Sequence, residues 1–317
     1  MRAPLAAFAL ISLALISLSA GRLWLTPEQI WVAVQEGPQG DVLFWHLRLP
    51  RVLGGLGIGA GLGLAGAVFQ SLLRNPLASP DIVGVSQGAA LGGVAAQLAG
   101  VATLLGAGLG GFLATVLIFA LSMSRSAGLD PRRLILYGIG TGITCSAALS
   151  ILLIRAGDAA AGQAMAWLAG SLNGIGWPEV QIATLALGLA GVVLLPSTRT
   201  LDRLEFGDDT ARGWGLALHL SRPALALSAA LLVSAMVALA GTLSFVAFIS
   251  GPIARSLTKG RVTLIGAAAV GATLVTLADL ATRVLAPSAL LPAGIYTSLI
   301  GAPWLVVILK ASFKSPR

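Results

Sequence analysis

The segment that decides the fold is RNPLASPDIVGVSQGAALG, residues 74–92, which interrupts an apolar chain with a polar turn. Proline lacks a backbone donor and disfavours helix in the residue before it, so Asn75-Pro76 and Ser79-Pro80 each predict the end of a helix. Backbone groups freed at membrane depth must be satisfied by protein or by a water-filled cavity. The segment is therefore either a plain loop between two membrane spans or part of a pathway through the membrane.

The composition places the chain in a membrane. Hydrophobic residues make up 56% of the 317 residues and charged residues 10%, with a mean hydropathy of +0.92, which excludes a soluble domain with a polar shell. The apolar runs are continuous rather than alternating, which favours helices over the strands of a barrel. At about 20 residues per span, we predict an all-α polytopic membrane protein with one transmembrane domain over residues 1–317. About ten spans are expected, near residues 4–20, 52–73, 84–101, 103–123, 134–154, 178–196, 223–240, 243–257, 263–283 and 292–309.

The net charge of +8 is distributed as membrane topology requires. If the N-terminus is cytoplasmic, fifteen of the 20 Lys and Arg residues fall inside and five fall outside, namely Arg22, Arg48, Arg51, Arg155 and Arg283. This asymmetry predicts that both termini are cytoplasmic, and it accounts for the basic charge without a nucleic-acid partner. Four tryptophans near the expected outer interface fit an aromatic belt against membrane lipid: Trp24, Trp31, Trp45 and Trp177.

The glycines between residues 57 and 66 include a GxGxxG pattern, which marks a dinucleotide site in other contexts. No strand is expected before it and its surroundings are apolar, so close helix packing through overlapping GxxxG pairs is the better interpretation. No GxxxxGK[ST] loop occurs in the sequence, so any ATPase must be another polypeptide. His46 and His219 lie far apart without a set of cysteines or carboxylates, and the sole cysteine, Cys145, lies in an expected span. We therefore expect no metal and no cofactor on this chain.

Two charged groups near the expected outer surface allow alternative interpretations. Arg48 and Arg51 flank a proline at the mouth of a span, where they either anchor the span in the interface or receive an acidic soluble partner. Asp279 lies within a span, and Arg283 follows it by one helical turn. The carboxylate is either a functional group, as in a proton relay, or one half of an intramembrane ion pair with Arg283.

The longest inner loop spans residues 197–222 and carries LDRLEFGDDTARGWGLAL. Its mixed charges, with glycines at the breaks, predict one or two short helices at the membrane face. The loop is either solvated or a surface that receives force from a cytoplasmic partner.

Six ordered motifs resemble the FecCD-type permeases of bacterial ABC importers for iron chelates and cobalamin. They are RLPR at residue 48, the segment at residues 74–92, WLAGSLNG at 167–174, GDDTARGWG at 207–215, FVAFISGPIAR at 245–255 and LPAGIYTSLIGAPW at 291–304. The resemblance implies the type II ABC importer permease fold of about ten helices, in the bacterial inner membrane. It also implies a second permease subunit, identical or homologous, two cytoplasmic ATPase subunits that use ATP, and a periplasmic substrate-binding protein. The segment at residues 4–20 also resembles a signal peptide, but the resemblance favours a retained first span.

The resemblance also implies roles for individual residues. Arg48, Arg51 and Arg283 match the arginines that receive glutamates of the binding protein. The loop at residues 207–215 matches the helices that couple the permease to the ATPase, which implies contacts through Gly207, Asp208, Asp209, Ala211, Arg212 and Gly215. The cytoplasmic gate is expected at Asn75, Leu77, Pro131 and Arg132.

The sequence departs from the family pattern at two places. Small hydroxyl residues often stand in the family where Pro131 and Arg132 stand here, and Gly251-Pro252 replaces the usual Pro-His pair. We predict a permease subunit that imports an iron chelate, a ferric siderophore, with cobalamin or haem as the alternative cargo, and no chemistry on the cargo. The rival from another class is an ion-coupled carrier that draws energy through Asp279 or Asp81.

Overall fold

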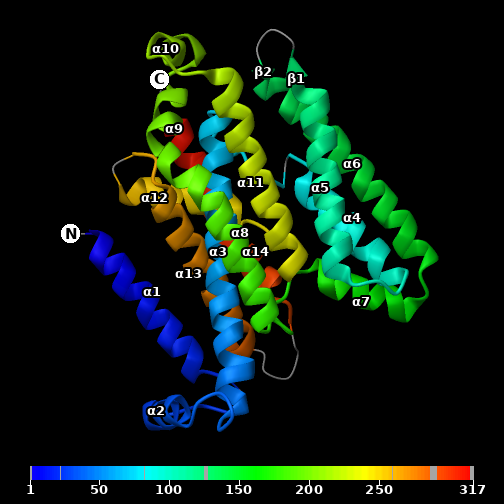
Figure 1. Ribbon diagram of the computed structural model, residues 1–317, viewed down its shortest axis with the longest axis vertical. Helices are drawn as coiled ribbons and strands as arrows, with labels where there is room; N and C mark the ends of the chain where they lie inside the picture. Colours follow the sequence, from blue (N-terminus) through cyan, green and yellow to red (C-terminus); the bar gives the residue numbers. More distant parts are fainter. Residues whose placement is uncertain are drawn as a thin grey trace.

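The computed structural model describes residues 2–21, 23–81, 83–124, 128–258, 260–285 and 291–314, and most of them are helical (Figure 1). One two-residue strand pair, β1 (Met123–Ser124) with β2 (Gly128–Leu129), is antiparallel. The helices are α1 (Arg2–Ser19), α2 (Pro27–Glu36), the π-helix η1 (Leu43–Arg48), α3 (Leu49–Leu72), α4 (Val85–Leu98), α5 (Thr103–Ser122), α6 (Pro131–Arg155), α7 (Asp158–Leu168), α8 (Trp177–Leu194), the 3-10 turn η2 (Leu195–Ser197), α9 (Thr198–Glu205), α10 (Asp208–Gly213), α11 (Leu218–Ala240), α12 (Val246–Leu257), α13 (Leu264–Leu285) and α14 (Ala293–Lys314).

The all-α membrane class is confirmed, and each of the ten expected segments overlaps a helix. Within the described ranges, six helical stretches are long and apolar enough to cross a membrane, fewer than the ten expected, and three shorter apolar helices accompany them. Two short helices, α4 and α12, follow breaks in the backbone. Gly84 before α4 and Phe245 before α12 both have positive φ, at 79° and 66°. Such residues cannot continue a right-handed helix, so α4 and α12 start late.

Two helices, α2 and α7, lie in stretches that the sequence suggested were connections. α2 begins with a capping box in which the Thr26 hydroxyl accepts from the Gln29 amide and the Gln29 side chain accepts from the Thr26 amide. α7 is rich in alanine, the strongest helix former. Both are shorter than a membrane span, so a search for long apolar runs does not find them.

The core surrounds α3, the most deeply buried span, which packs against α8, α11, α12 and α13 (Figure 1). A Cβ atom at Gly59 would lie 2.4 Å from the Gly271 carbonyl oxygen of α13, and one at Gly63 would lie 2.2 Å from that of Ala267. Only glycine permits this approach of two backbones, so the packing role expected for this row is confirmed.

The helices α4 to α7 form a second group at one side of the molecule (Figure 1). Within it, α4 and α5 also pack through glycines, because a Cβ at Gly92 would lie 2.2 Å from the Gly106 carbonyl oxygen. The group joins the core through α11, which packs on both α4 and α5. α2 lies at one end of the molecule and α10 at the other, and these are called the α2 end and the α10 end below (Figure 1).

Candidate functional site

The turn after α3 is built by Asn75. Its side-chain oxygen accepts the Leu77 amide at 2.9 Å, and its own amide donates to the Gln70 carbonyl at 3.0 Å. Arg74 just before it has a positive φ of 51°. An Asx turn of this kind fixes the chain reversal before Pro76. Asn75 therefore shapes the turn with its side-chain oxygen, while Leu77 is half-buried.

The loop between α8 and α11 folds into α9 and α10, separated by Gly207 at a φ of 102°. Leu201, Leu204 and Ala211 are fully buried and hold the two short helices against the bundle. Asp209 is fully exposed and lies 3.2 Å from the Arg212 guanidinium. Gly215 ends the unit, also with a positive φ, of 77°.

Asp208 ties α10 to two other elements at this end. Its two carboxylate oxygens accept from both terminal nitrogens of Arg222 on α11, at 2.7 and 3.0 Å, and Oδ1 lies 3.5 Å from Arg74 in the turn. The hydrogen bonds from Arg222, offset in part by burial, and the charges of Arg222, Arg74 and Arg212 lower the pKa of Asp208 below its usual value. Arg222 is only 3% exposed, so the pair is shielded from water on that side. α10 is thus linked to the turn through one carboxylate.

A second ion pair ties α9 to the ends of α12 and α3. Arg255 donates to Glu205 at 2.5 Å and to the Ser71 hydroxyl at 2.8 Å. The four elements α3, α9, α10 and α12 therefore converge on one polar cluster at the α10 end.

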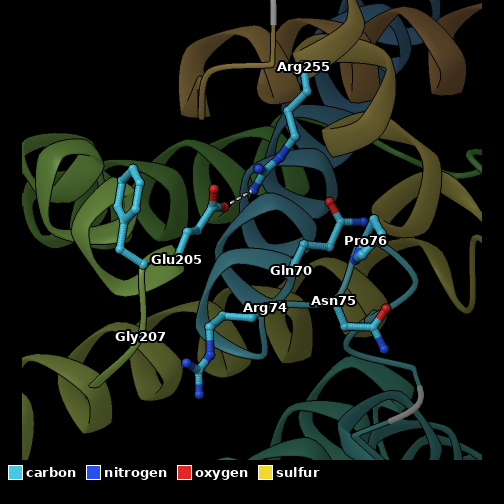
Figure 2. Close-up of a pocket in the computed structure, with 8 residues that line it drawn as sticks. Gln70, Arg74, Asn75, Pro76, Glu205, Gly207 and Arg255 are labelled. Carbon is cyan, nitrogen blue, oxygen red and sulfur yellow. Dashed lines mark hydrogen bonds and ion pairs between the residues drawn. The ribbon is translucent and has the colours of Figure 1, made fainter. Parts of the chain in front are cut away.

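A cavity of about 540 Å³ opens within this cluster, lined by Gln70, Arg74, Asn75, Pro76, Glu205, Phe206, Gly207 and Arg255. Figure 2 shows the Glu205–Arg255 pair on one side of it and the Arg74–Asn75 turn on the other. The Gln70 amide nitrogen donates to the Phe248 carbonyl at 2.8 Å. A Cβ at residue 251 would lie 2.0 Å from the Gln70 side-chain oxygen. Gly251, one of the two departures from the family pattern, therefore leaves the space that Gln70 occupies.

Pro131 and Arg132 begin α6, where the Asp130 carboxylate accepts the Arg132 amide at 2.9 Å. They line a second cavity together with Arg74 and Asp208, so these two expected gate residues lie beside the start of α10.

The α2 end gathers the other expected residues around Asp279. Arg51 donates to Asp279 Oδ1 through Nε at 2.9 Å and through a terminal nitrogen at 2.7 Å, and Arg283 lies 3.1 Å from Oδ2. The Asp279 side chain is only 2% exposed. Asp279 is thus shared between two arginines rather than paired with Arg283 alone.

Arg48, and the remaining donors of Arg283, bind the backbone at and just after the C-terminal end of α1. Arg48 donates to the carbonyls of Leu18 at 2.8 Å, Ser19 at 2.7 Å and Leu23. Arg283 donates to those of Ser17 at 2.8 Å and Ala20 at 2.7 Å, and to the Ser17 hydroxyl. The last carbonyls of a helix lack partners within it and carry partial negative charge, so two guanidinium groups suit this place. The three expected docking arginines therefore lie together, but Arg48 and Arg283 hold α1 to the bundle. Arg51 keeps 22% of its side chain exposed.

Sequence reasoning missed Gln70, Glu205, Arg222 and Arg255 as members of the polar cluster. The sequence could have indicated a buried ion pair at Arg222, because a charged side chain in an apolar helix requires a partner. Its partner, Asp208, was instead placed among ATPase contacts.

The chain is similar to known proteins along almost its whole length. The model of the FecCD transport family matches residues 9–311. The chain is 37% identical over 305 residues to the "Vitamin B12 import system permease protein BtuC" of Escherichia coli O6:K15:H31, over 94% of this chain and 91% of that protein. The protein of the same name from Salmonella typhi is also 37% identical, over 303 residues, with the same coverage.

Two solved structures share the fold. One is described as "An inward-facing conformation of a putative metal-chelate type ABC transporter", with a TM-score of 0.85, 30% identity, and coverage of 96% of this chain and 97% of that one. The other, PsaBC from Streptococcus pneumoniae in complex with Fab, has a TM-score of 0.58 and 18% identity, over 87% of this chain and 95% of that one, and shows the fold alone.

Proposed function

Because the chain belongs to the FecCD transport family, we propose that this ABC importer permease passes a metal chelate, a ferric siderophore, from the periplasm to the cytoplasm. Its partners are a second permease subunit, two ATPase subunits that hydrolyse ATP, and a periplasmic binding protein. The chain lies in the inner membrane as one permease domain, with both termini and the α10 end in the cytoplasm. The greater number of basic residues expected on that side supports this orientation.

The observation that carries the mechanism is the shared carboxylate of Asp208. The ATPase pair, docked on α9 and α10, moves these helices when it binds ATP and closes. Because Asp208 binds Arg74 of the turn and Arg222 of α11, the motion reaches the gate at Asn75 and Leu77. The Glu205–Arg255 pair carries the same motion to α12. Gly207 leaves α10 free to change its angle to α9.

The binding protein docks at the α2 end through acidic residues. Arg51 is the docking arginine, since it lies beside Arg48 and Arg283 and retains an exposed side chain. Arg48 and Arg283 contribute positive charge and position α1.

A second cargo is supported by a specific observation. The relatives at 37% identity carry vitamin B12 import in their names, so cobalamin is the second candidate. A structural relative at 30% identity is described as a metal-chelate type transporter, which supports the first candidate cargo, a ferric siderophore. An ion-coupled carrier is less well supported, because both carboxylate oxygens of Asp279 are engaged by Arg51 and Arg283 in structural ion pairs.

Uptake into proteoliposomes tests the function. The permease is reconstituted with its ATPase and binding protein and offered a ferric siderophore or cobalamin, with ATP inside the vesicles. ATP-dependent accumulation of the siderophore supports the proposal, and accumulation of cobalamin alone replaces the cargo. Accumulation driven by a proton gradient without the ATPase contradicts the proposal altogether.

A further inference from the structure

A second, smaller cavity at the α10 end has a volume of about 290 Å³. Its lining comes from the turn after α3, the start of α6, α10 and α11, and consists of Arg74, Leu129, Asp130, Pro131, Arg132, Asp208 and Arg222. Three of these side chains are guanidinium groups, and each comes from a different element. Such convergence brings together positive charges that repel one another unless an anion lies between them.

The two carboxylates of this cavity already have partners. Asp208 binds both terminal nitrogens of Arg222, and Asp130 caps α6 through the Arg132 amide and lies 3.9 Å from Arg133. In the described ranges, Arg132 has no partner for its guanidinium group. The lining therefore carries one more positive than negative charge, with Arg132 as the cation that is left over.

Arg222 contributes charge to the lining rather than a free donor. Both of its terminal nitrogens bind Asp208, and its buried Nε is closed to water, so a ligand in the cavity does not reach it. The donors that the cavity offers to a ligand therefore come from Arg132 and Arg74.

The start of α6 favours the same ligand. α6 has 25 residues, and Pro131 and Arg132 form its first positions at the cavity wall. The Asp130 carboxylate already caps this N-terminus, so the attraction for a phosphate comes from the Arg132 side chain, whose planar guanidinium fork matches phosphate oxygens. At about 30 Å³ per water molecule, the cavity holds roughly ten water volumes, enough for a phosphate group.

We propose that this cavity binds a phosphate group, carried either by free phosphate or by an anionic lipid headgroup. The Arg132 guanidinium is its first ligand, with Arg74 as a further donor.

A bound phosphate would connect the start of α6 to Arg74 in the turn after α3, and Arg74 in turn lies 3.5 Å from Asp208 of α10. It would stabilise the present arrangement of the α10 end. The effect on transport rests on the proposed function, whereas the binding does not.

The test measures the thermal stability of the purified full-length protein in dodecyl maltoside, a detergent without phosphate. One arm titrates inorganic phosphate against chloride at equal ionic strength. The other titrates short-chain phosphatidylglycerol against a diacylglycerol with the same chains. Arg132→Gln is the test variant, and Arg133→Gln is the matched control, since it removes the neighbouring charge, which does not line the cavity.

We expect phosphate or phosphatidylglycerol to raise the melting temperature of the wild type and of Arg133→Gln. The apparent affinity should fall about tenfold in Arg132→Gln, as for loss of one charge-assisted hydrogen bond. A response to inorganic phosphate identifies the free anion, and a response to the lipid alone identifies the headgroup. If Arg132→Gln does not fold, Arg132→Lys against Arg133→Lys repeats the comparison, because lysine lacks the fork.

No stabilisation by either probe overturns the proposal, as does an equal response of the variants at residues 132 and 133. The test contains no ATPase and no cargo. Its failure therefore leaves the uptake experiment untouched, and failure of ATP-driven uptake leaves the binding result standing.

Discussion

Asp279 at the α2 end and Asp208 at the α10 end each lie between two arginines, but in opposite surroundings. Asp279 is 2% exposed, and one of its arginines also binds the backbone of α1. Asp208 is 30% exposed, and Arg74, which lies 3.5 Å away, is 43% exposed. A buried carboxylate held by two arginines makes a fixed anchor, while a partly hydrated pair can break and re-form at lower cost. The same residue types thus build an anchor at one end and a movable link at the other.

The largest effect is expected at the anchor. Asp279→Asn leaves Arg51 and Arg283 facing each other without their shared carboxylate, and loss of one partner from a buried ion pair costs about 3–5 kcal/mol. Denaturation of the detergent-solubilised protein, followed by tryptophan fluorescence, measures the loss. Asp209→Asn is the control, because Asp209 is fully exposed. An unchanged midpoint in Asp279→Asn would show that the cluster is not an anchor.

The stability that the pairing of Asp208 with Arg222 and Arg74 contributes should be lost only on acidification. The lowered pKa of Asp208 means that its pairing stabilises the folded state at any pH above the unfolded value, about 3.9 for Asp. The stability is lost as pH falls through the lower, folded value. Between pH 6 and 8 the difference between wild type and Asp208→Asn should therefore be constant, at about 1–3 kcal/mol.

The measurement is the unfolding midpoint of both proteins from pH 8 down to pH 3. The difference between them should shrink only at the acid end. A difference that changes between pH 6 and 8 would mean that Asp208 is not held ionised by its arginines.

The smallest effect is expected for docking at the α2 end. Arg51→Glu reverses one partly exposed charge, so affinity for the binding protein should fall several-fold at low salt, and less at high salt. Surface plasmon resonance at two salt concentrations measures this. Arg155→Glu, which also reverses a charge expected outside, is the control. Equal losses in both variants would remove the specific role of Arg51.

Features set by local patterns could be predicted from the sequence, whereas contacts between distant segments could not. The spans follow from apolar length, and the glycine row of α3 follows from GxxxG spacing, because both patterns are local. The partners of Asp208 and Glu205 could not be predicted, because Arg222 and Arg255 come from other helices, 14 and 50 residues away. The Asp279–Arg283 pair was predicted from its i, i+4 spacing. The backbone carbonyls near the end of α1 that Arg48 and Arg283 also bind are revealed by no residue type. The need for glycine at residue 251 is explained only by the Gln70 side chain, which occupies the space of a Cβ atom there.

The coupling ratio, the cargo taken up per ATP hydrolysed, tests whether Asp208 transmits the motion of α10 to the turn at Asn75. It is measured in proteoliposomes for wild type, Asp208→Asn and the control Asp158→Asn, an exposed carboxylate on α7, with assembly of the complex checked by size-exclusion chromatography. If Asp208 transmits the motion of α10 to the turn at Asn75, Asp208→Asn assembles and hydrolyses ATP but takes up several-fold less cargo per ATP. Asp158→Asn keeps the wild-type ratio. An Asp208→Asn complex with the wild-type ratio would show that Asp208 does not transmit this motion.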